Sequence, residues 1–324
     1  MITRILPKII LEETKHTIKK LANNDLILKL LKCGFKKESN LVKDCGNTRV
    51  FSLQQHQITQ DKRRRLKRAD FCKFRFCITC NWRRDMNIQK SLLSALQEID
   101  KKNNVEFIFL TLTVPNCHID DLKATIQHMN KSFQRLAETK AYKKAVLGHF
   151  KALEILGDNT KGAEAHPHFH ILLIVDKNYF TSKNYISQKE FLQMWRDATR
   201  NQNITQVDIR IIKPNKDKNA TASAVAEMCK YPLKDTDISK LTSEQFEKFV
   251  LQLKGIRNIN AGGNLKNILK GTEKMDNDLV HIDDEHNDQL WKSIQKISYC
   301  FETREKKLNY YLGKQFKIME NENG

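Results

Sequence analysis

Two histidines at alternate positions of an apolar segment are the residues of this chain best placed to do chemistry. His168 and His170 stand in the pentapeptide His-Pro-His-Phe-His, which runs directly into Ile-Leu-Leu-Ile-Val. Alternate residues of a β-strand point to the same face and lie about 7 Å apart. The spacing therefore predicts that both imidazoles can hold one metal ion.

A carboxylate on a neighbouring strand is the expected third ligand. Glu154 interrupts an otherwise apolar segment, and a buried charge there needs a reason such as a metal. Glu164 and His166, in or beside the intervening turn, are alternatives. Carboxylate and imidazole ligands with open positions favour Mg²⁺ or Mn²⁺ bound together with a substrate phosphate, on which the ion acts as a Lewis acid.

A tyrosine further along the chain is the candidate nucleophile. Glu227 and Tyr231 are four residues apart, so they share a face of the predicted helix that Pro232 ends. An unperturbed tyrosine has a pKa of about 10 and needs activation. We expect Lys230 and Lys234 to stabilise the phenolate and Glu227 to act as a base, although a tyrosine before a proline is, taken alone, ordinary packing.

Four cysteines form the second candidate site. Cys72, Cys77 and Cys80 follow the pattern C-x4-C-x2-C, and Cys45 can supply a fourth thiolate from across a loop. Four soft ligands make a closed tetrahedral zinc site. The alternative is that some of them are simply buried thiols.

Basic and aromatic residues surround these cysteines. The basic residues are predicted to contact DNA phosphates, and the aromatic ones either stack on bases or form a small core. The predicted DNA-binding residues are Lys73, Arg75, Arg83 and Arg84, and the aromatic residues are Phe74, Phe76 and Trp82. A basic run at residues 61–68 leads directly into the cysteine cluster, although such a run is usually just a solvated segment.

Composition limits the class of partner. The chain has 57 Lys and Arg against 38 Asp and Glu, a net charge of +19, which favours nucleic acid over a membrane surface as the partner. No segment approaches the roughly 18–20 apolar residues of a membrane span, and the N-terminus lacks the apolar core of a signal peptide. We therefore expect a cytoplasmic protein whose eight cysteines are thiols or metal ligands.

Hydrophobic periodicity predicts an α+β fold. Helices are expected at residues 12–31, 119–138, 188–200 and 221–230, and strands at residues 106–114, 149–156, 167–175 and 205–213. This order predicts an antiparallel sheet of the ferredoxin-like kind, with helices on one face, the other face free for a ligand and the histidine strand central.

Three consecutive regions are predicted. Residues 1–100 form a helical and cysteine-containing DNA-binding module, residues 101–236 carry the catalytic core, and residues 237–324 are mostly helical with a loosely ordered basic tail.

In this order the motifs resemble those of the rolling-circle plasmid replication initiators, a branch of the HUH endonuclease superfamily. The HUH element is His168-Phe169-His170, residues 109–116 (Phe-Leu-Thr-Leu-Thr-Val-Pro-Asn) are similar to the first motif, and Glu227 to Lys234 match E-x3-Y-x2-K. The cysteine segment with its trailing Trp-Arg-Arg is also similar, and the resemblance spans residues 45–280.

The resemblance implies an HUH nuclease fold and a mechanism. Tyr231 would nick single-stranded origin DNA and become linked to the 5′ phosphate, with His168, His170 and Glu154 as metal ligands. The freed 3′ hydroxyl would prime synthesis with a host helicase and polymerase, and either a second transesterification or water activated by Glu227 would end the cycle. A departure is His166, where the family pattern has Asn.

Two other functions remain open on the sequence alone. The segment from His166 to Leu172 also fits the pattern of histidine-triad nucleotide hydrolases, which need no metal. A zinc-containing DNA-binding regulator without enzymatic activity is the second alternative.

Overall fold

The computed structural model describes residues 2–156, 163–213, 220–228, 241–267, 279–280, 290–304 and 307–317. The chain divides into two compact units: residues Met1–Met86 with Lys274–Gly324, and residues Asn87–Glu273. This division differs from the three consecutive regions predicted, because the last part of the chain returns to the first unit. No helix in these ranges is long and apolar enough to cross a membrane.

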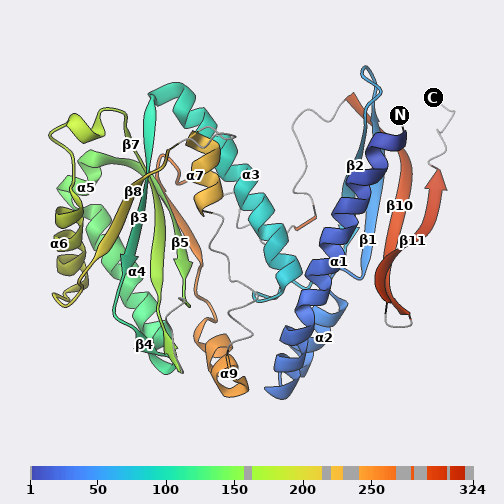
Figure 1. Cartoon of the computed structure of the whole chain (residues 1–324), viewed down its shortest axis with the longest axis horizontal. Helices are drawn as coiled ribbons and strands as arrows, with labels where there is room; N and C mark the ends of the chain where they lie inside the picture. Colours follow the sequence, from blue (N-terminus) through green and yellow to red (C-terminus); the bar gives the residue numbers. More distant parts are fainter. Residues whose placement is uncertain are drawn as a thin grey trace. The chain divides into compact units, whose positions relative to one another are not determined.

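The second unit is built on a five-stranded antiparallel sheet (Figure 1). Its order is β8 (Val207–Ile211), β3 (Val105–Thr113), β7 (His168–Asp176), β5 (Val146–Glu154) and β9 (Ile259–Gly263). The histidine strand β7 is central, as predicted, and β5 and β7 pair antiparallel. Every residue of β7 except Asp176 is buried.

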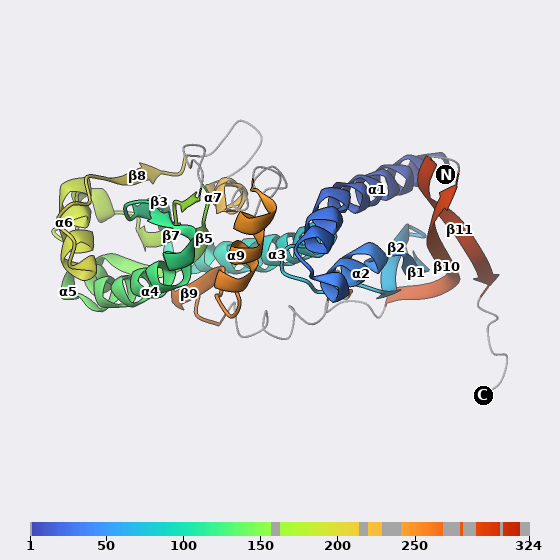
Figure 2. The same cartoon turned by 90° about the horizontal axis from the view of Figure 1, so that it is seen from below.

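Helices cover both faces of this sheet, so the prediction of one free face is wrong. On one face lie α4 (Leu122–Glu138), α5 (Lys140–Ala145) and α6 (Gln188–Thr199) (Figure 2). On the other, α7 (Ala220–Met228) and the later part of α3 (Ile78–Asn103) share a core cluster with residues of β3 and β7. The apolar side chains of β3 alternate between these two layers, which is why both need a cover.

Local sequence explains where these elements begin and end. In α6 the Ser187 side chain accepts from the backbone of Glu190 while the Glu190 side chain accepts from that of Ser187, and the helix ends where Arg200 takes a left-handed φ of 56°. Thr242 and Gln245 form the same box at α9 (Ser243–Gln252). The predicted α4, α6, α7, β3, β5, β7 and β8 are all present within a few residues of their predicted bounds.

Short elements complete the second unit. β4 (Cys117–His118) pairs with β6 (Glu164–Ala165), and the 3-10 helices are η1 (Ile119–Asp121) and η2 (Tyr179–Thr181).

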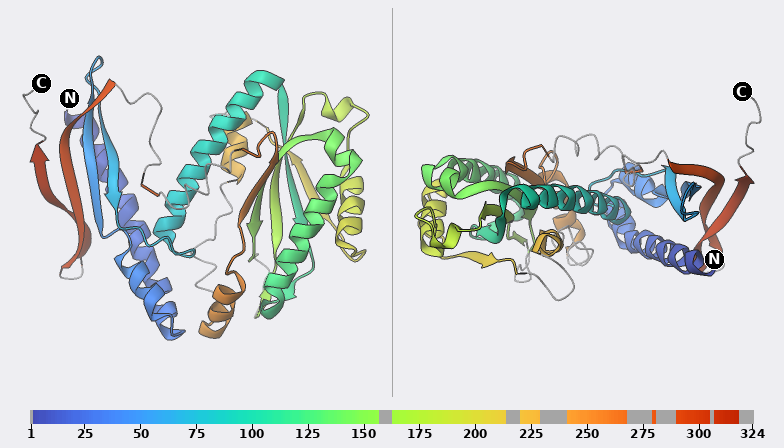
Figure 3. Two further views of the ribbon diagram at one scale, coloured as in Figure 1. Left: turned by 180° about the vertical axis from the view of Figure 1, so that it is seen from behind. Right: turned by 90° about the horizontal axis from the view of Figure 1, so that it is seen from above.

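The described part of the first unit contains a four-stranded antiparallel sheet, two helices of its own and the start of α3 (Figure 3). The helices are α1 (Ile2–Lys32) and α2 (Lys36–Asp44), and the sheet order is β11 (Lys307–Lys317), β10 (Trp291–Arg304), β1 (Thr48–His56) and β2 (Lys62–Ala69). Phe51, Leu66, Ile297 and Tyr299 form its small core.

The structure of this unit differs from the sequence-based expectations. The basic run forms strand β2, which was not predicted, and the region after residue 236 is not mostly helical, since its described part holds one helix and three strands. The predicted loose tail includes β11. Both strands β2 and β10 are stabilised by pairing with β1. Local periodicity does not reveal such pairing, so neither strand could be predicted from it.

Candidate active site and metal centres

The strand register brings Glu154, His168 and His170 together. Glu154 of β5 lies opposite His168 of β7, and His170 is two residues further along the same face. Glu154 Oε2 is 2.7 Å from His170 Nε2 and 3.2 Å from His168 Nε2. One ligand atom from each of the three lies within 4.8 Å of the others, the arrangement that a shared metal ion requires.

Burial and hydrogen bonding tune the carboxylate. The side chains of Glu154, His168 and His170 are 15%, 10% and 8% exposed. Burial raises the pKa of Glu154, but its hydrogen bonds with the two histidines outweigh burial and bring the pKa to about 2. Glu154 is therefore ionised and suited to be a metal ligand.

Contacts at the second ring nitrogen orient both imidazoles. His168 Nδ1 donates to the His166 carbonyl oxygen at 2.7 Å, and His170 Nδ1 lies 3.4 Å from Thr111 Oγ1. The His170 ring also stacks on Phe109 at 5.4 Å. These contacts turn both Nε2 atoms toward Glu154, as outer-shell hydrogen bonds do around metal-binding histidines.

Glu164 and His166, the two alternative ligands, lie beside the site, and the Asn116 side chain bridges them. His166 Nδ1 is 2.7 Å from Asn116 Oδ1, and Asn116 Nδ2 donates to Glu164 Oε2 at 3.1 Å. Among the residues that the structure describes, the group able to hold a metal here consists of Glu154, His168 and His170 alone. Sequence reasoning missed Thr111 and Asn116 as individual supports, although both lie in the segment similar to the first family motif.

The tyrosine segment is described only in part. Tyr231, Lys230 and Lys234 lie outside the described residues, and Glu227 is in α7, where the course of the backbone but not its side chain is described. Ala224, Val225 and Met228 of α7 belong to the core cluster that also holds Phe109 and Leu172. The helix therefore lies over the same face of the sheet as His170.

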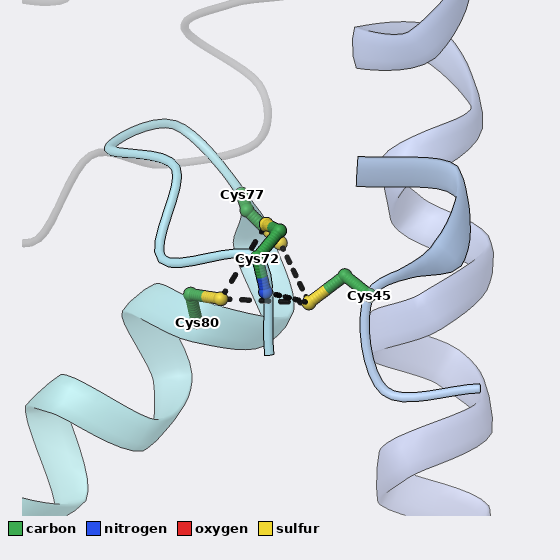
Figure 4. Close-up of side chains that lie close together, drawn as sticks. All are labelled: Cys45, Cys72, Cys77 and Cys80. Carbon is green, nitrogen blue, oxygen red and sulfur yellow. Dashed lines mark hydrogen bonds between the residues drawn. The ribbon is translucent and has the colours of Figure 1, made fainter. Parts of the chain in front are cut away.

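The four cysteines predicted to bind zinc gather at one point (Figure 4). Cys45 Sγ is 3.4 Å from Cys80 Sγ and 3.5 Å from Cys77 Sγ, and Cys72 Sγ is 3.7 Å from Cys80 Sγ. Cys45, the ligand from across the loop, is fully buried. Four sulfurs at these separations match the donor set of a closed tetrahedral zinc site.

Hydrogen bonds among the cysteines shift their pKa values in opposite directions. They raise the pKa of Cys45 and lower the pKa of Cys77. The contact with Cys45 lowers the pKa of Cys80, but contacts with Cys72 and Cys77 and burial outweigh it, so this pKa is raised. The ammonium of buried Lys20, from α1, donates to the carbonyl oxygens of Lys43 and Cys45, so a cation lies beside the cluster. Burial lowers the pKa of Lys20, and the nearby thiols oppose that shift.

Two of the predicted DNA-binding residues make hydrogen bonds within the protein. Arg83 is 5% exposed, and its guanidinium donates to the carbonyl oxygens of Leu279 and Val280, at 2.9 and 3.3 Å. Arg84 donates to the Lys73 carbonyl oxygen at 2.6 Å and so braces the loop between Cys72 and Cys77. Arg83 in particular is not available to phosphate.

The remaining residues of this group differ in exposure. Lys73 is exposed and Arg75 is half-buried. Phe76 is 3% exposed and Trp82 packs edge-on against His16 at 4.5 Å, so these two aromatics belong to the core of the module.

Comparison with known proteins agrees with the family resemblance of the motifs. The model of a family described as "Replication protein" (Rep_1) matches residues 63–311, which spans parts of both units. The chain is 38% identical over 225 residues to "Protein rep" of Staphylococcus aureus, covering 69% of this chain and 93% of that protein.

Two further relatives carry the same name. "Protein rep" of Bacillus amyloliquefaciens is 36% identical over 258 residues, which cover 73% of this chain and 76% of that protein. "Protein rep" of Streptococcus pneumoniae is 31% identical over 277 residues, which cover 84% of this chain and 83% of that protein. No solved structure matches the chain. The chain belongs to this replication-protein family, the plasmid Rep initiators that its motifs resemble.

Proposed function

We propose that this protein initiates rolling-circle replication by nicking one strand of origin DNA through Tyr231. The observation that carries the proposal is the grouping of Glu154, His168 and His170 within 4.8 Å on a central strand, under the helix that leads to Tyr231. One carboxylate and two imidazoles suit Mn²⁺ or Mg²⁺ with positions left for a phosphate. Such a cation would polarise the scissile phosphodiester.

The place of Tyr231 in the sequence supports this proposal. Tyr231 follows Met228, the last described residue of α7, by three positions. Met228 shares a core cluster with Phe109, whose ring stacks on His170. The end of α7 therefore lies over the sheet face that carries His170, and this supports Tyr231 as the nucleophile of the proposal.

The proposed reaction is a transesterification. The phenol oxygen of Tyr231 attacks phosphorus, Glu227 accepts the phenol proton, and the bond from phosphorus to the 3′ oxygen breaks. The 3′ oxygen takes a proton from solvent and becomes the primer that a host polymerase extends behind a helicase. Lys230 and Lys234 stabilise the developing phenolate, and a second transesterification or water activated by Glu227 ends the cycle.

Covalent trapping tests the proposal. The full-length protein is incubated with Mn²⁺ and single-stranded oligonucleotides that tile its own replicon's origin, and the adduct is measured on a denaturing gel. The wild type and Tyr185→Phe, which alters an exposed tyrosine remote in sequence, should form it, whereas Tyr231→Phe should not. An adduct with Tyr231→Phe would refute the assignment, and no wild-type adduct on any segment would refute nicking.

The two alternatives make different predictions in the same assay. A histidine-triad hydrolase would act equally well in EDTA, and a non-enzymatic regulator would bind the oligonucleotide without an adduct. Family membership and the ionised Glu154 between the two histidines favour the metal-dependent nickase over both.

A further inference from the structure

The sheet of the first unit has one face on which basic side chains converge. Across three strands, Arg65 of β2 lies opposite Ser52 of β1, which lies opposite Lys296 of β10. In the next row of the same face, Arg63 lies opposite Gln54 and Gln54 opposite Ser293. Arg68 continues the row on β2, opposite Val50. We call the set Arg63, Arg65, Lys67, Arg68 and Lys296 the basic sheet face, with Lys67 at the bulge of β2.

The charge of this face exceeds what an edge strand needs. β1 and β2 together contain seven basic residues and no acidic one, and six of the eight residues of β2 are basic. Charged side chains, especially lysine, protect an edge strand from aggregation, but here the charge continues past the edge strand to Lys296 of β10. Lys67, Arg68 and Lys296 are exposed, so the positive charge faces solvent where a polyanion can reach it.

The arginine at the end of the face is held in place. The Arg63 guanidinium stacks over the Trp291 ring at 4.2 Å, and its Nε donates to Gln54 Oε1 at 2.9 Å. An ordered guanidinium loses less side-chain entropy on binding a phosphate than a mobile one does. The guanidinium covers one face of the Trp291 ring, and the His56 ring packs edge-on against Trp291 at 5.0 Å.

We propose that the basic sheet face binds duplex DNA beside the nick site, separately from the metal centre. Lys296 lies two strands from Arg65, about 10 Å away, so the cations are spread in two dimensions rather than along one line. The major groove of B-DNA is about 12 Å wide, and a face of this width can contact phosphates on both of its sides. Single-strand sites instead combine a narrow basic groove with open aromatic platforms.

Duplex binding by the basic sheet face rests on the proposed nicking function only in one respect, the choice of origin DNA as the probe. The test measures binding of the full-length protein to a fluorescent duplex from its own origin, by anisotropy, from about 50 to 200 mM salt. The variant Lys67→Gln, Arg68→Gln, Lys296→Gln removes three exposed charges of the face. The matched control Lys140→Gln, Lys143→Gln, Lys144→Gln removes three exposed charges of α5, at the end of β5 remote from Glu154.

Three lost phosphate contacts should weaken duplex binding about tenfold or more and lower the slope of log K against log salt by about 3. The control should match the wild type in both. Binding of the single-stranded nick-site oligonucleotide, and the Tyr231 adduct on it, should be unchanged in the face variant. Circular dichroism and zinc content establish that each variant is folded.

Three results would overturn the proposal: an unchanged duplex affinity in the face variant, an equal loss in the α5 control, or an equal loss for the single strand. Failure of the wild type to form an adduct would refute nicking and leave the duplex result standing, so the two proposals fail separately.

Discussion

In both histidines of the candidate site, Nε2 faces Glu154 and Nδ1 contacts another group: the His166 carbonyl oxygen or Thr111 Oγ1. The sequence did not reveal these orienting contacts. His168 and His170 could be predicted because alternate strand positions share a face, and Glu154 because a buried carboxylate needs a partner. Thr111 and Asn116 could not, since a threonine or asparagine near the end of a strand is common and gains a role only when its neighbour is known.

Removing the Glu154 charge should weaken metal binding. Glu154→Gln keeps the shape of the side chain but loses the ionised oxygen that lies within 3.2 Å of both imidazoles, and we expect Mn²⁺ affinity to fall by about 100-fold or more, with loss of the nicked product. Isothermal titration with Mn²⁺ measures the affinity. Glu164→Gln, which is bound to Asn116 outside the ligand group, should change it little; equal losses would contradict the assignment.

Lys151 should make the second unit more stable as pH rises. It is 5% exposed, its Nζ donates to Asn130 and lies 3.7 Å from the Phe169 ring centroid, and burial lowers its pKa to about 7. Between that value and the unfolded pKa near 10.4, the unfolded chain binds more protons than the folded one, so stability rises with pH by up to about 1.4 kcal/mol per unit.

Urea unfolding at about pH 7.5 and pH 9.5 measures this effect. The wild type should be the more stable at the higher pH, and Lys151→Met should lose most of that difference. A wild-type stability that falls over this interval would contradict the depressed pKa of Lys151.

Elements with strong local periodicity could be predicted, and elements that depend on distant pairing could not. The strands of the second unit are apolar runs or alternate clearly, and its amphipathic helices have caps that can be read from sequence. β2 is basic almost throughout, and β10 joins β1 from the other end of the chain, so neither carries a local signal. β9 also has a weak local signal, because two of its five residues are glycines and it pairs with β5, a distant segment.

Close approach of β5 and β9 should make Gly263 intolerant of a side chain. A Cβ there would lie 2.4 Å from the Leu147 carbonyl oxygen and 2.7 Å from Gly148 Cα, and its φ is +60°. Gly255 has a φ of +79° but open space around it, so Gly255→Ala measures the cost of the backbone conformation without the cost of a clash. We expect Gly263→Ala to destabilise by about 1–3 kcal/mol more than Gly255→Ala in urea unfolding; equal effects would contradict the predicted clash.

The molecule as a whole consists of two units that the order of the sequence does not separate. The prediction of three consecutive regions followed changes in composition along the chain, which cannot reveal that residues 274–324 return to the first unit. The two groups of side chains that could hold a metal divide accordingly, with the four cysteines in the first unit and Glu154, His168 and His170 in the second.

This division predicts that loss of zinc affects one unit selectively. Cys45→Ser should abolish binding of one zinc ion per chain and lower the stability of the first unit, because Cys45 joins the end of α2 to the loop before α3. Zinc is measured by elemental analysis and stability by hydrogen exchange resolved by peptide. Cys33→Ser, outside the cluster, is the control and should retain zinc; equal loss of protection in both units would contradict the selectivity.

The pairing of β1 with β10 has a consequence for synthesis of the protein. On the ribosome the chain emerges from its N-terminus, and domains fold as their segments become available. The second unit has all of its residues before residue 274, whereas the sheet of β1 and β2 is complete only after β10 and β11 have emerged. The first unit therefore begins to emerge first but is completed last. A chain that left the ribosome before β10 was made would contain the candidate nicking centre but not the complete sheet that carries the basic sheet face.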